Sequence, residues 1–468
     1  MNTTHMKHLN RRNFIQKTGL GAAATLLSSF SGKAEGLTSD PQKYMGGFAA
    51  PALPTVRMAF IGVGYRGHGH AAQWSQIEGT EIVALCDLHQ DLVEKTKKTC
   101  ETHGKGQRHQ SIQTYSGSEN AWKKMLEEVP VDAVIISTNW KNHAPMAQRS
   151  MLSGAHAFVE VPLGLTIDEL WQLIETSERT QKHCMMLENV NYGREELLFL
   201  NICRQGKIGE LLHGEAAYIH ELRWQMEEVD RGTGSWRTPH YAKRNGNLYP
   251  THGLGPVAQY MNIARGEDVF DRMVSFSTPA MGRNQYVQKK YAQGPRWNEY
   301  DFKGGDLNTS IIKTKLGRTI LVQWDETSPR PYSRHNLIQG TQGTLAGFPT
   351  RMAFDGGFEG ITDSHHQWIE GDALAALYDA YEHPLYKRLG ALSQKMGGHG
   401  GMDFMMRYRI VECLQQGQPL DQNIYEGCFW SAVSPLSEAS VKEEGAPQKF
   451  PDFTRGLWKK TQPLAIIS

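Results

Sequence analysis

Three glycines and an aspartate form the first pattern in the sequence with clear chemical meaning. Gly62, Gly64 and Gly67 follow the apolar run 56–61 as G-x-G-x-x-G, and Asp87 ends a second apolar run. The first glycine permits a tight turn, the second lets backbone approach a pyrophosphate, and the third lets a helix pack against a strand. An acid about 20 positions further on accepts hydrogen bonds from ribose hydroxyls, which favours NAD over NADP. The pattern predicts a dinucleotide site, with a plain strand-to-helix turn as the alternative.

Further polar residues follow the next predicted strands. Segments 131–138 and 156–160 are apolar and alternate with helical stretches, which is typical of a doubly wound parallel sheet. Ligands bind beyond the carboxyl ends of such strands. The side chains expected at the nicotinamide end of this cleft are Asn139, Trp140, His143, Glu160 and Val161. We expect residues 139–143 to form a loop, and ordinary loop packing is the alternative role for Trp140 and His143.

Two histidines and six cysteines raise the question of a metal. His68 and His70 are two positions apart, so they do not share a helix face, and we expect turn or helix-start residues there. No metal site is expected. The cysteines form no CxxC pair, so neither a zinc site nor a disulfide framework is indicated, and pairing between individual cysteines stays open. They are Cys86, Cys100, Cys184, Cys203, Cys413 and Cys428.

Composition indicates a soluble protein with more than one domain. The chain has 468 residues, of which 39% are hydrophobic and 21% charged. These values are ordinary for a globular protein, and the length suits two domains. The net charge of +1, with acidic and basic residues interspersed, offers no bulk attraction to nucleic acid or to an anionic membrane.

The N-terminal segment has the arrangement of an export signal. Arg11 and Arg12 precede a mild apolar run, and Gly32-Lys33-Ala34 offers a small-x-small cleavage pattern. This predicts a twin-arginine signal over residues 1–34, a linker over 35–54 and export to the periplasm. The apolar run is too short for a membrane span, so no membrane association is expected after cleavage. An anchor helix or a disordered tail is the alternative.

Several of these stretches together resemble a known superfamily. "FIGVGYRG", "ALCD", "VDAVIIST" and "HAFVEVP" are similar to segments of the glucose-fructose oxidoreductase / inositol dehydrogenase superfamily. The resemblance implies a Rossmann NAD-binding domain over 55–180 and a second α/β domain with a large, mostly antiparallel open sheet over 181–445. A C-terminal extension, 446–468, would pack on the body. Members of the superfamily often assemble through the open sheet, which implies a homo-oligomer.

A narrower resemblance is carried by the second half. "HCMMLENVNYG" (183–193), "AAYIHELRW" (216–224), "NLYPTHGLGP" (247–256) and "SPRPYSRHNLIQGTQGTL" (328–345) resemble glycoside hydrolase family 109, whose members are NAD-dependent α-N-acetylgalactosaminidases. Besides the three glycines, the residues that the resemblance implies as contacts with NAD are Tyr65, Arg66, Asp87, Trp140, His143, Glu160, Val161 and Asn189. The residues implied around the sugar are Tyr192, Arg237, Tyr249, Pro250, Thr251, His252 and Tyr332. The segment 397–403 resembles a superfamily segment that starts a helix beside the cleft. Contact between His399 in this segment and a ligand stays open.

The resemblance also implies a mechanism without net redox chemistry. Transfer of hydride from carbon 3 of the sugar to NAD makes the hydrogen on carbon 2 acidic. Elimination then releases the group on carbon 1, water adds, and the hydride returns. A tightly bound NAD that is recycled in this way suits an exported enzyme, because no free cofactor has to be supplied.

Roles for individual residues follow from that mechanism. His252 would take the proton of the carbon 3 hydroxyl, and either Tyr192 or Tyr249 would deprotonate carbon 2. Glu160 would orient the sugar or help to protonate the leaving oxygen, and Arg237 would bind a hydroxyl or the acetamido carbonyl. For any single tyrosine, core packing is the alternative.

Two other functions compete with the glycosidase. One is a periplasmic NAD(P)-dependent sugar oxidoreductase of the same superfamily, and the other is a non-catalytic sugar-binding protein. The superfamily usually shows Glu-Lys-Pro where this chain has Glu160-Val161-Pro162, so the lysine that assists hydride transfer is missing, which argues against the oxidoreductase. The polar cluster of Tyr192, Arg237, Tyr249 and His252 argues against the binding protein.

Overall fold

The computed structural model describes residues 43–103, 109, 111–291 and 296–466. The described residues all belong to one compact unit, Pro41–Ser468. The predicted export signal and the first part of the predicted linker, residues 35–42, lie outside the described residues. Within the described residues, no helix is long and apolar enough to cross a membrane.

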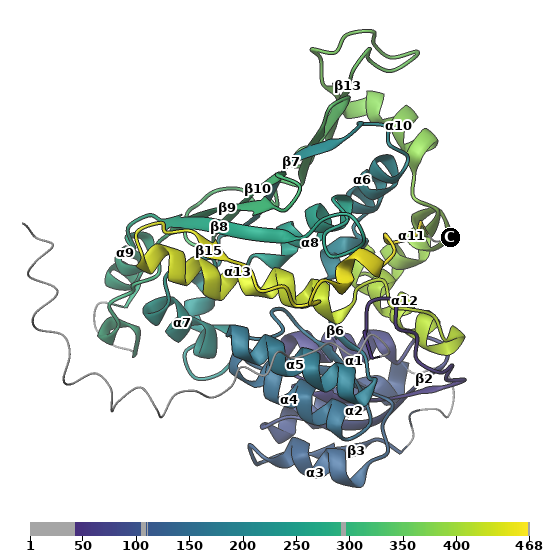
Figure 1. The fold of residues 1–468 in the computed structure, drawn as a ribbon. Coiled ribbons are helices and arrows are strands. Elements are labelled where there is room, and N and C mark those ends of the chain that lie inside the picture. The colour runs from purple at the N-terminus through teal and green to yellow at the C-terminus, as the bar shows by residue number, and fades with distance from the viewer. Residues whose placement is uncertain (1–42, 104–108, 110, 292–295, 467–468) are drawn as a thin grey trace, which may run out of the picture. The chain divides into compact units, whose positions relative to one another are not determined.

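The first half of this unit forms a six-stranded parallel sheet in the order β3-β2-β1-β4-β5-β6 (Figure 1). The strand order and the helices between the strands confirm the predicted Rossmann arrangement. The strands are β1 (Val56–Ile61), β2 (Thr80–Cys86), β3 (Gln113–Tyr115), β4 (Ala133–Ile136), β5 (His156–Val159) and β6 (Cys184–Met186). The helices are α1 (Tyr65–Trp74), α2 (Gln90–His103), α3 (Ala121–Glu128), α4 (Trp140–Leu152) and α5 (Ile167–Thr180).

Both faces of this sheet are covered, which explains why its strands are apolar throughout. Alternate residues of β1 lie in different core clusters: Ala59 and Ile61 join one, and Met58 and Phe60 join the other. The first cluster includes α4, α5 and α13 (Ile424–Lys442), and the second includes α1 and α12 (Met402–Gln416). Two helices from the end of the chain therefore complete the core of the first half. Because β6 also pairs in this sheet, the sheet extends past the expected boundary at residue 180.

The second half forms a nine-stranded sheet in the order β14-β13-β12-β11-β7-β10-β9-β8-β15. Every pair is antiparallel except β7 with β10, which confirms a mostly antiparallel sheet. The long strands are β7 (Leu211–Ile219), β8 (Phe270–Ser277), β9 (Leu307–Thr314) and β10 (Thr319–Asp325). The short strands are β11 (Leu337–Gly340), β12 (Gly343–Ala346), β13 (Arg351–Phe354), β14 (Ile369–Glu370) and β15 (Gln448–Lys449). Strands β9 and β10 pair as an antiparallel hairpin.

Helices cover one face of this second sheet. Those packed on it are α8 (Thr251–Tyr260), against β7, and α13, against β8. The remaining helices are α6 (Arg194–Arg204), α7 (Thr233–Lys243), α9 (Gly282–Lys290), α10 (Leu374–Tyr381) and α11 (Pro384–Met396). Exposed apolar side chains on the strands include Phe276 and Ile311. At the end of the chain, β15 pairs with β8, and Phe450, Phe453 and Trp458 are buried.

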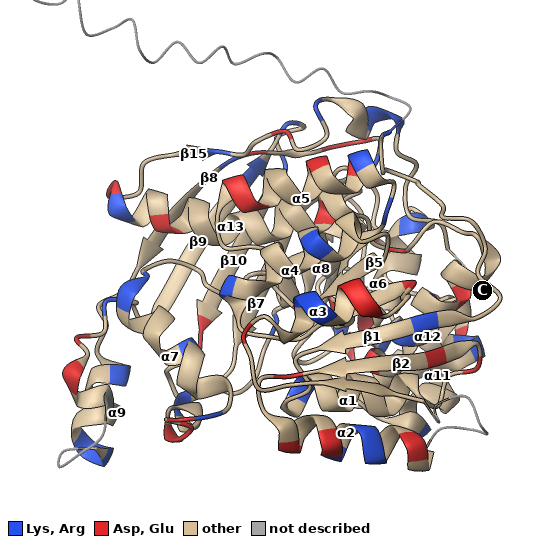
Figure 2. Ribbon diagram, turned by 90° about the horizontal axis from the view of Figure 1, so that it is seen from below, with Lys and Arg blue, Asp and Glu red and all other residues tan. Residues whose placement is uncertain are grey.

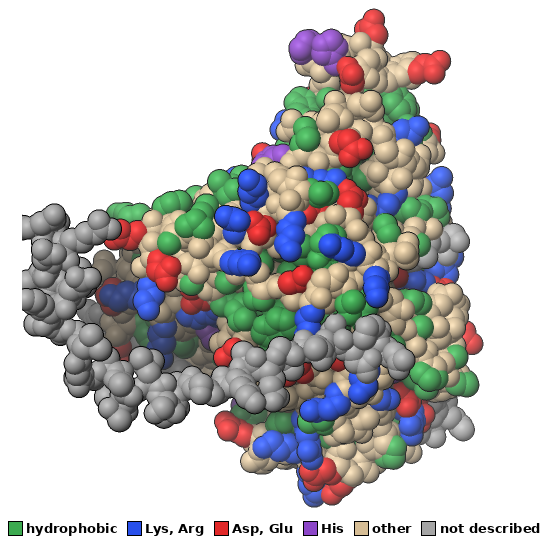
Figure 3. Space-filling model, in the orientation of Figure 1, with side chains coloured by type: hydrophobic (Ala, Val, Ile, Leu, Met, Phe, Trp, Pro, Cys, Tyr) green, Lys and Arg blue, Asp and Glu red, His purple; other side chains and the backbone are tan. Residues whose placement is uncertain are grey.

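Charged side chains are distributed without a large field of one sign. Figure 2 shows acidic and basic residues interspersed along α2, and Figure 3 shows the same mixture on one face of the molecule. This distribution agrees with a net charge of +1.

Candidate functional site

The glycine turn between β1 and α1 is built as the motif predicts. Gly62 has a φ of +82°, and a Cβ there would lie 2.6 Å from the carbonyl oxygen of Ser137. A Cβ on Gly67 would lie 1.8 Å from the carbonyl oxygen of Gly62, so only glycine lets α1 pack this closely. A Cβ on Gly64 would meet nothing within 4 Å, which leaves open space at the N-terminus of α1. A helix N-terminus with open space in front of it suits a diphosphate.

Asp87 lies at the end of β2 and braces this turn. One carboxylate oxygen accepts a hydrogen bond from the Val63 amide at 2.8 Å, and the other accepts one from the His89 amide at 3.0 Å. Each oxygen keeps a further lone pair for a ribose hydroxyl. Tyr65, the first residue of α1, is 97% exposed.

Two buried amides next to the strand ends also fit a cofactor. The side-chain oxygens of Asn139, which precedes α4, and of Asn189, which follows β6, are buried without a hydrogen-bond partner in the protein. A buried acceptor without a partner is costly, so such atoms commonly mark a place for a bound donor. The turn, Asp87 and these two amides together fit a nicotinamide dinucleotide.

Glu160, directly after β5, is held by two basic side chains from α1. Its Oε1 lies 2.7 Å from Nε of Arg66 and 2.6 Å from Nε2 of His70. Burial alone would raise the pKa of Glu160, but the Arg66 charge and the His70 hydrogen bond hold it below its usual range. An ionised carboxylate has no proton to give, so of the two roles expected for Glu160 these contacts favour orientation over acid catalysis.

Helix α12 closes this cluster from the other side. Asp403 accepts from both terminal nitrogens of Arg66, at 2.6 and 3.1 Å, and from Nδ2 of Asn189 at 2.6 Å. His399 lies 2.9 Å from Asp403 on the exposed side. Sequence reasoning missed Asp403, although the glycine-rich segment 397–403 did point to a helix start beside the cleft.

His70 is a buried member of the same cluster. The expectation that His68 and His70 are turn or helix-start residues is wrong for His70, which lies inside α1 and is fully buried. Arg407 donates from Nε to its Nδ1 at 2.9 Å, so Nε2 carries the proton shared with Glu160. Burial and the charge of Arg407 lower the pKa of His70 to about 3, which keeps the ring neutral.

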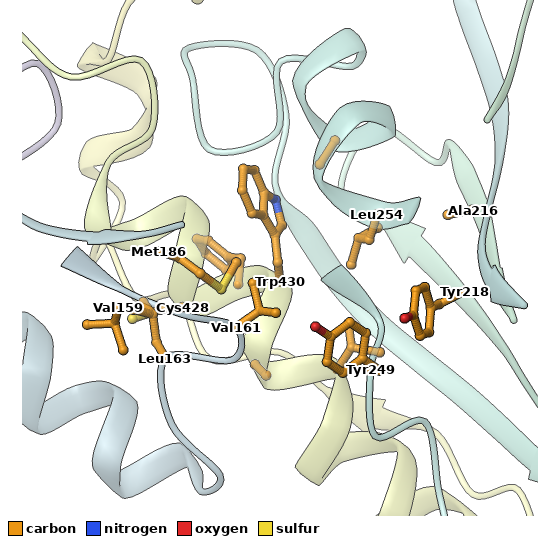
Figure 4. Packing of buried hydrophobic residues seen from close by; sticks show 14 of the residues in the cluster. Val159, Val161, Leu163, Met186, Ala216, Tyr218, Tyr249, Leu254, Cys428 and Trp430 are labelled. Carbon is orange, nitrogen blue, oxygen red and sulfur yellow. The ribbon is translucent and has the colours of Figure 1, made fainter. Parts of the chain in front are cut away.

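Trp140 and His143 lie in the first turn of α4, not in the expected loop, because the helix begins directly after Asn139. Both ring nitrogens of His143 lie near backbone carbonyls, Nδ1 at 2.7 Å from Pro162 and Nε2 at 3.1 Å from Thr138. His143 thus ties the ends of β4 and β5 together. Val161 is buried, and Figure 4 shows it close to Trp430 of α13.

Aromatic rings surround Arg237 at the junction of the two sheets. The Arg237 guanidinium lies 5.1 Å from the ring centroids of both Trp140 and Tyr249, and 5.4 Å from that of Trp236. The Tyr249 ring packs at a tilt against that of Tyr218, with centroids 4.6 Å apart, and the two rings lie side by side in Figure 4. Trp140 belongs to the first sheet's cleft, so this contact joins the predicted sugar residues to the predicted nicotinamide end.

Tyr218 and His220 are functional candidates that sequence reasoning did not single out. The Tyr218 ring lies 5.3 Å from the His252 ring and 6.2 Å from that of Tyr332, and its hydroxyl is 2.9 Å from Nδ1 of His220. Both residues fall in the stretch 216–224, which resembles family 109. The alternation of side chains along β7 could have indicated them, because it directs residues 216, 218 and 220 to one face of the sheet.

Three more predicted sugar residues lie at the start of α8. Pro250 precedes the helix, Thr251 is buried within it, and His252 reaches the carboxylate of Glu188 with Nδ1 at 2.6 Å from Oε1. Tyr332 is 40% exposed, and its hydroxyl accepts from Arg334 at 2.9 Å. Glu188 was not singled out from the sequence.

The structure does not bring Tyr192 into contact with the other predicted sugar residues. Its hydroxyl donates to Asp421 at 3.1 Å, and Asp421 is paired with Arg409 at 2.8 Å. Burial and the Asp421 charge raise the pKa of Tyr192 well above its usual value, so its phenol stays protonated and directed at Asp421. Of the two tyrosines expected to deprotonate carbon 2, Tyr249 is the one beside His252, with ring centroids 5.0 Å apart.

The described residues contain no cluster of three or more ligating side chains that could hold a metal ion. All six cysteines lie in the described part of the chain, and all are free. This settles the question of pairing that the sequence left open.

The fold and the glycine turn define a class of proteins in which a Rossmann domain for a nicotinamide dinucleotide is joined to an open, mostly antiparallel sheet. Residues 56–188 match the oxidoreductase family with an NAD-binding Rossmann fold. The levoglucosan dehydrogenase structure with NADH and levoglucosan superposes with a TM-score of 0.63 at 14% identity, over 85% of this chain and 100% of that one. An oxidoreductase domain protein from Kribbella flavida gives the same TM-score at 15% identity, over 85% and 100%. These two likenesses concern the fold alone.

The second half identifies the family within that class. Residues 192–460 match the C-terminal domain of glycosyl hydrolase 109. Glycosyl hydrolase family 109 protein 1 of Akkermansia muciniphila is 55% identical, over 98% of this chain and 99% of its own length. The family 109 protein of Shewanella pealeana is 53% identical over the same shares. The chain therefore belongs to glycosyl hydrolase family 109, a glycosidase with an NAD(P)-binding domain that acts on a glycan.

Proposed function

We propose that this protein hydrolyses terminal α-linked N-acetylgalactosamine with a tightly held NAD that is recycled within each turnover, and that it does so after twin-arginine export to the periplasm. The observation that carries the proposal is the contact between the two halves of the site. Trp140, at the carboxyl end of β4, lies against Arg237 and Tyr249. A sugar bound by Arg237 and Tyr249 would thus lie beside the nicotinamide.

The residues around the glycine turn would hold the cofactor. Asp87 would accept from the adenosine ribose, which favours NAD over NADP, and the α1 N-terminus would face the diphosphate. Bound NAD would supply a reversible hydride acceptor for carbon 3 of the sugar, which makes the hydrogen on carbon 2 acidic without net redox chemistry.

The aromatic cluster would do the remaining chemistry. His252 would hold the proton of the carbon 3 hydroxyl, and Tyr249 would remove the proton on carbon 2. Burial raises the pKa of Tyr249 above its usual value, and the charge of Arg237 opposes part of this rise, so a phenolate that forms during the reaction would have Arg237 beside it. Arg237 would also bind a sugar hydroxyl or the acetamido carbonyl, and Trp140 and Trp236 would pack on the apolar face of the ring.

The test uses the protein purified from the periplasm with no nucleotide added. With p-nitrophenyl α-N-acetylgalactosaminide we expect release of nitrophenol without a build-up of absorbance from NADH. Deuterium placed on carbon 2 of the sugar is expected to exchange with solvent, because that hydrogen leaves as a proton. The Arg11→Lys/Arg12→Lys variant is expected to have the same specific activity, but the protein should stay in the cytoplasm.

Other outcomes point elsewhere. A requirement for a second sugar as hydride acceptor would identify an oxidoreductase, and full retention of the deuterium label would exclude elimination. Activity that reaches the periplasm equally in the double arginine variant would exclude the twin-arginine route.

A further inference from the structure

His252 meets a buried carboxylate that lies 64 positions earlier in the chain. Nδ1 of His252 is 2.6 Å from Oε1 of Glu188. Glu188 is 0% exposed, whereas the side chain of His252 keeps 15% of its surface. In the described part of the chain no hydrogen bond engages Nε2 of His252. The protein therefore holds the imidazole through Nδ1, whereas Nε2 keeps its hydrogen-bonding capacity for a ligand.

The Glu188 carboxylate has its own supports. It follows β6 and begins the short 3-10 helix η3 (Asn189–Tyr192), where Oε1 also accepts from the Val190 amide at 3.2 Å. Its backbone carbonyl accepts from Nε2 of Gln422 at 2.9 Å. Among the described residues, His252 is the basic side chain within ion-pair distance of this carboxylate, and Oε2 is buried with no protein partner. A buried carboxylate in this situation strongly favours an N–H directed at it.

Two glycines of α8 allow the approach. A Cβ on Gly255 would lie 3.1 Å from Cγ of Glu188 and 2.9 Å from Oδ1 of Asn191. A Cβ on Gly253 would lie 2.3 Å from the backbone nitrogen of Ala217 in β7. The sequence His252-Gly253-Leu254-Gly255 thus lets one helix turn sit tightly between β7 and Glu188, which holds the imidazole in place.

We propose that Glu188 is the positioning residue of His252: it accepts a hydrogen bond from Nδ1–H and so leaves Nε2 as the lone-pair nitrogen that faces the sugar. This rests on the proposed function. With NAD bound as the hydride acceptor, the O–H bond at carbon 3 would break as an N–H bond forms at Nε2, and the O–H electron pair would become the second carbonyl bond. The Glu188 carboxylate would stabilise the positive charge that the ring then carries, and the same proton would return in the last step.

The test is Glu188→Leu, which has a similar length but removes the acceptor for the Nδ1–H group of His252. We expect kcat to fall by roughly a hundred- to ten-thousand-fold, as loss of the orienting carboxylate does in related dyads, with KM changed less than about threefold. The content of bound NAD should stay unchanged. Glu188→Asp, which keeps the charge, should recover part of kcat.

A matched control and a substrate-free readout make the test decisive. Glu178→Gln removes another ion-paired carboxylate, which binds Arg455 at 3.0 Å outside the site, and should leave kcat unchanged. Nitrogen NMR of labelled histidine should show His252 with its proton on Nδ1 in the unaltered protein and on Nε2 in Glu188→Leu, because an imidazole without an acceptor at Nδ1 prefers the Nε2–H tautomer. A tautomer that does not change, or a kcat within threefold of the unaltered protein, overturns the proposal. If no sugar is hydrolysed yet the tautomer changes, the pair stands and the proposed function fails.

Discussion

At the scale of single residues, Glu160 shows how a charge can be placed at a strand end without being a catalytic acid. Its carboxylate contacts Arg66 and His70, and Arg66 in turn contacts Asp403. Ion pairs this buried depend on every partner being present, because a single charge left in a low-dielectric interior is costly. The cluster therefore secures the glycine turn through Arg66 and holds α12 against it through Asp403.

Glu160→Gln is expected to lower the free energy of unfolding by about 3 kcal/mol, because Arg66 and His70 lose a buried partner. Loss of bound NAD should accompany this change. Urea unfolding and the nucleotide content of the purified protein measure both effects. Glu127→Gln, which breaks an exposed pair with Arg149, serves as the control and should change stability by less than about 0.5 kcal/mol. Unchanged stability together with a kcat reduced a hundredfold would instead assign Glu160 an acid role.

At the scale of elements, the site is made where helices begin. The N-termini of α1, α4, α8 and α12 carry Arg66, Trp140, His252 and Asp403 respectively. Helix starts place side chains at fixed positions next to unpaired backbone N–H groups, which suits the binding of polar ligands. The glycines of α1 decide how closely that helix approaches β1.

Two glycines in α1 give a matched pair of variants. In Gly67→Ala the new Cβ would lie 1.8 Å from the Gly62 carbonyl oxygen, so α1 must move and bound NAD should be lost. In Gly69→Ala the new Cβ meets nothing within 4 Å, so stability should rise by roughly 0.5–1 kcal/mol through better helix propensity. Thermal unfolding and nucleotide content report both results. Equal behaviour of the two variants would contradict the packing argument.

At the scale of the whole molecule, the two sheets are not independent. Helices α12 and α13 come from the end of the chain, yet they pack on opposite faces of the parallel sheet. We therefore expect residues 41–468 to unfold as one cooperative unit. Buried histidines in this unit include His70, His156 and His183, and burial lowers the pKa of each.

Those histidines predict acid lability. Burial and nearby Lys182 lower the pKa of His156 to about 4, so the folded state keeps it neutral. The unfolded chain takes up a proton below about pH 6.5, so stability falls as the pH drops from there towards the folded pKa. His156→Asn keeps an acceptor for the His183 amide, now 3.0 Å from Nδ1, but cannot titrate. Between pH 7.5 and 5.5 the variant should lose about 1 kcal/mol less than the unaltered protein in urea unfolding. Equal losses would contradict this assignment.

Much of the first half could be predicted because its signals are local. Strand β1 was predicted with its observed ends, since a strand covered on both faces reads as one apolar run. The roles of Gly62 and Gly67 follow from steric limits within a few residues. The loop expected at 139–143 was wrong, because α4 begins directly after Asn139; asparagine is a preferred N-cap residue, and that signal of a helix start was passed over.

The sequence by itself determined the Rossmann sheet, the dinucleotide turn and the family, because each depends on residues close together in the chain. Only the tertiary structure decided which polar groups meet. Glu188 contacts His252, Tyr218 packs against Tyr249, and Tyr192 donates a hydrogen bond to Asp421. These contacts join strands and helices that are far apart in sequence, so their partners are set by packing, which no local pattern records.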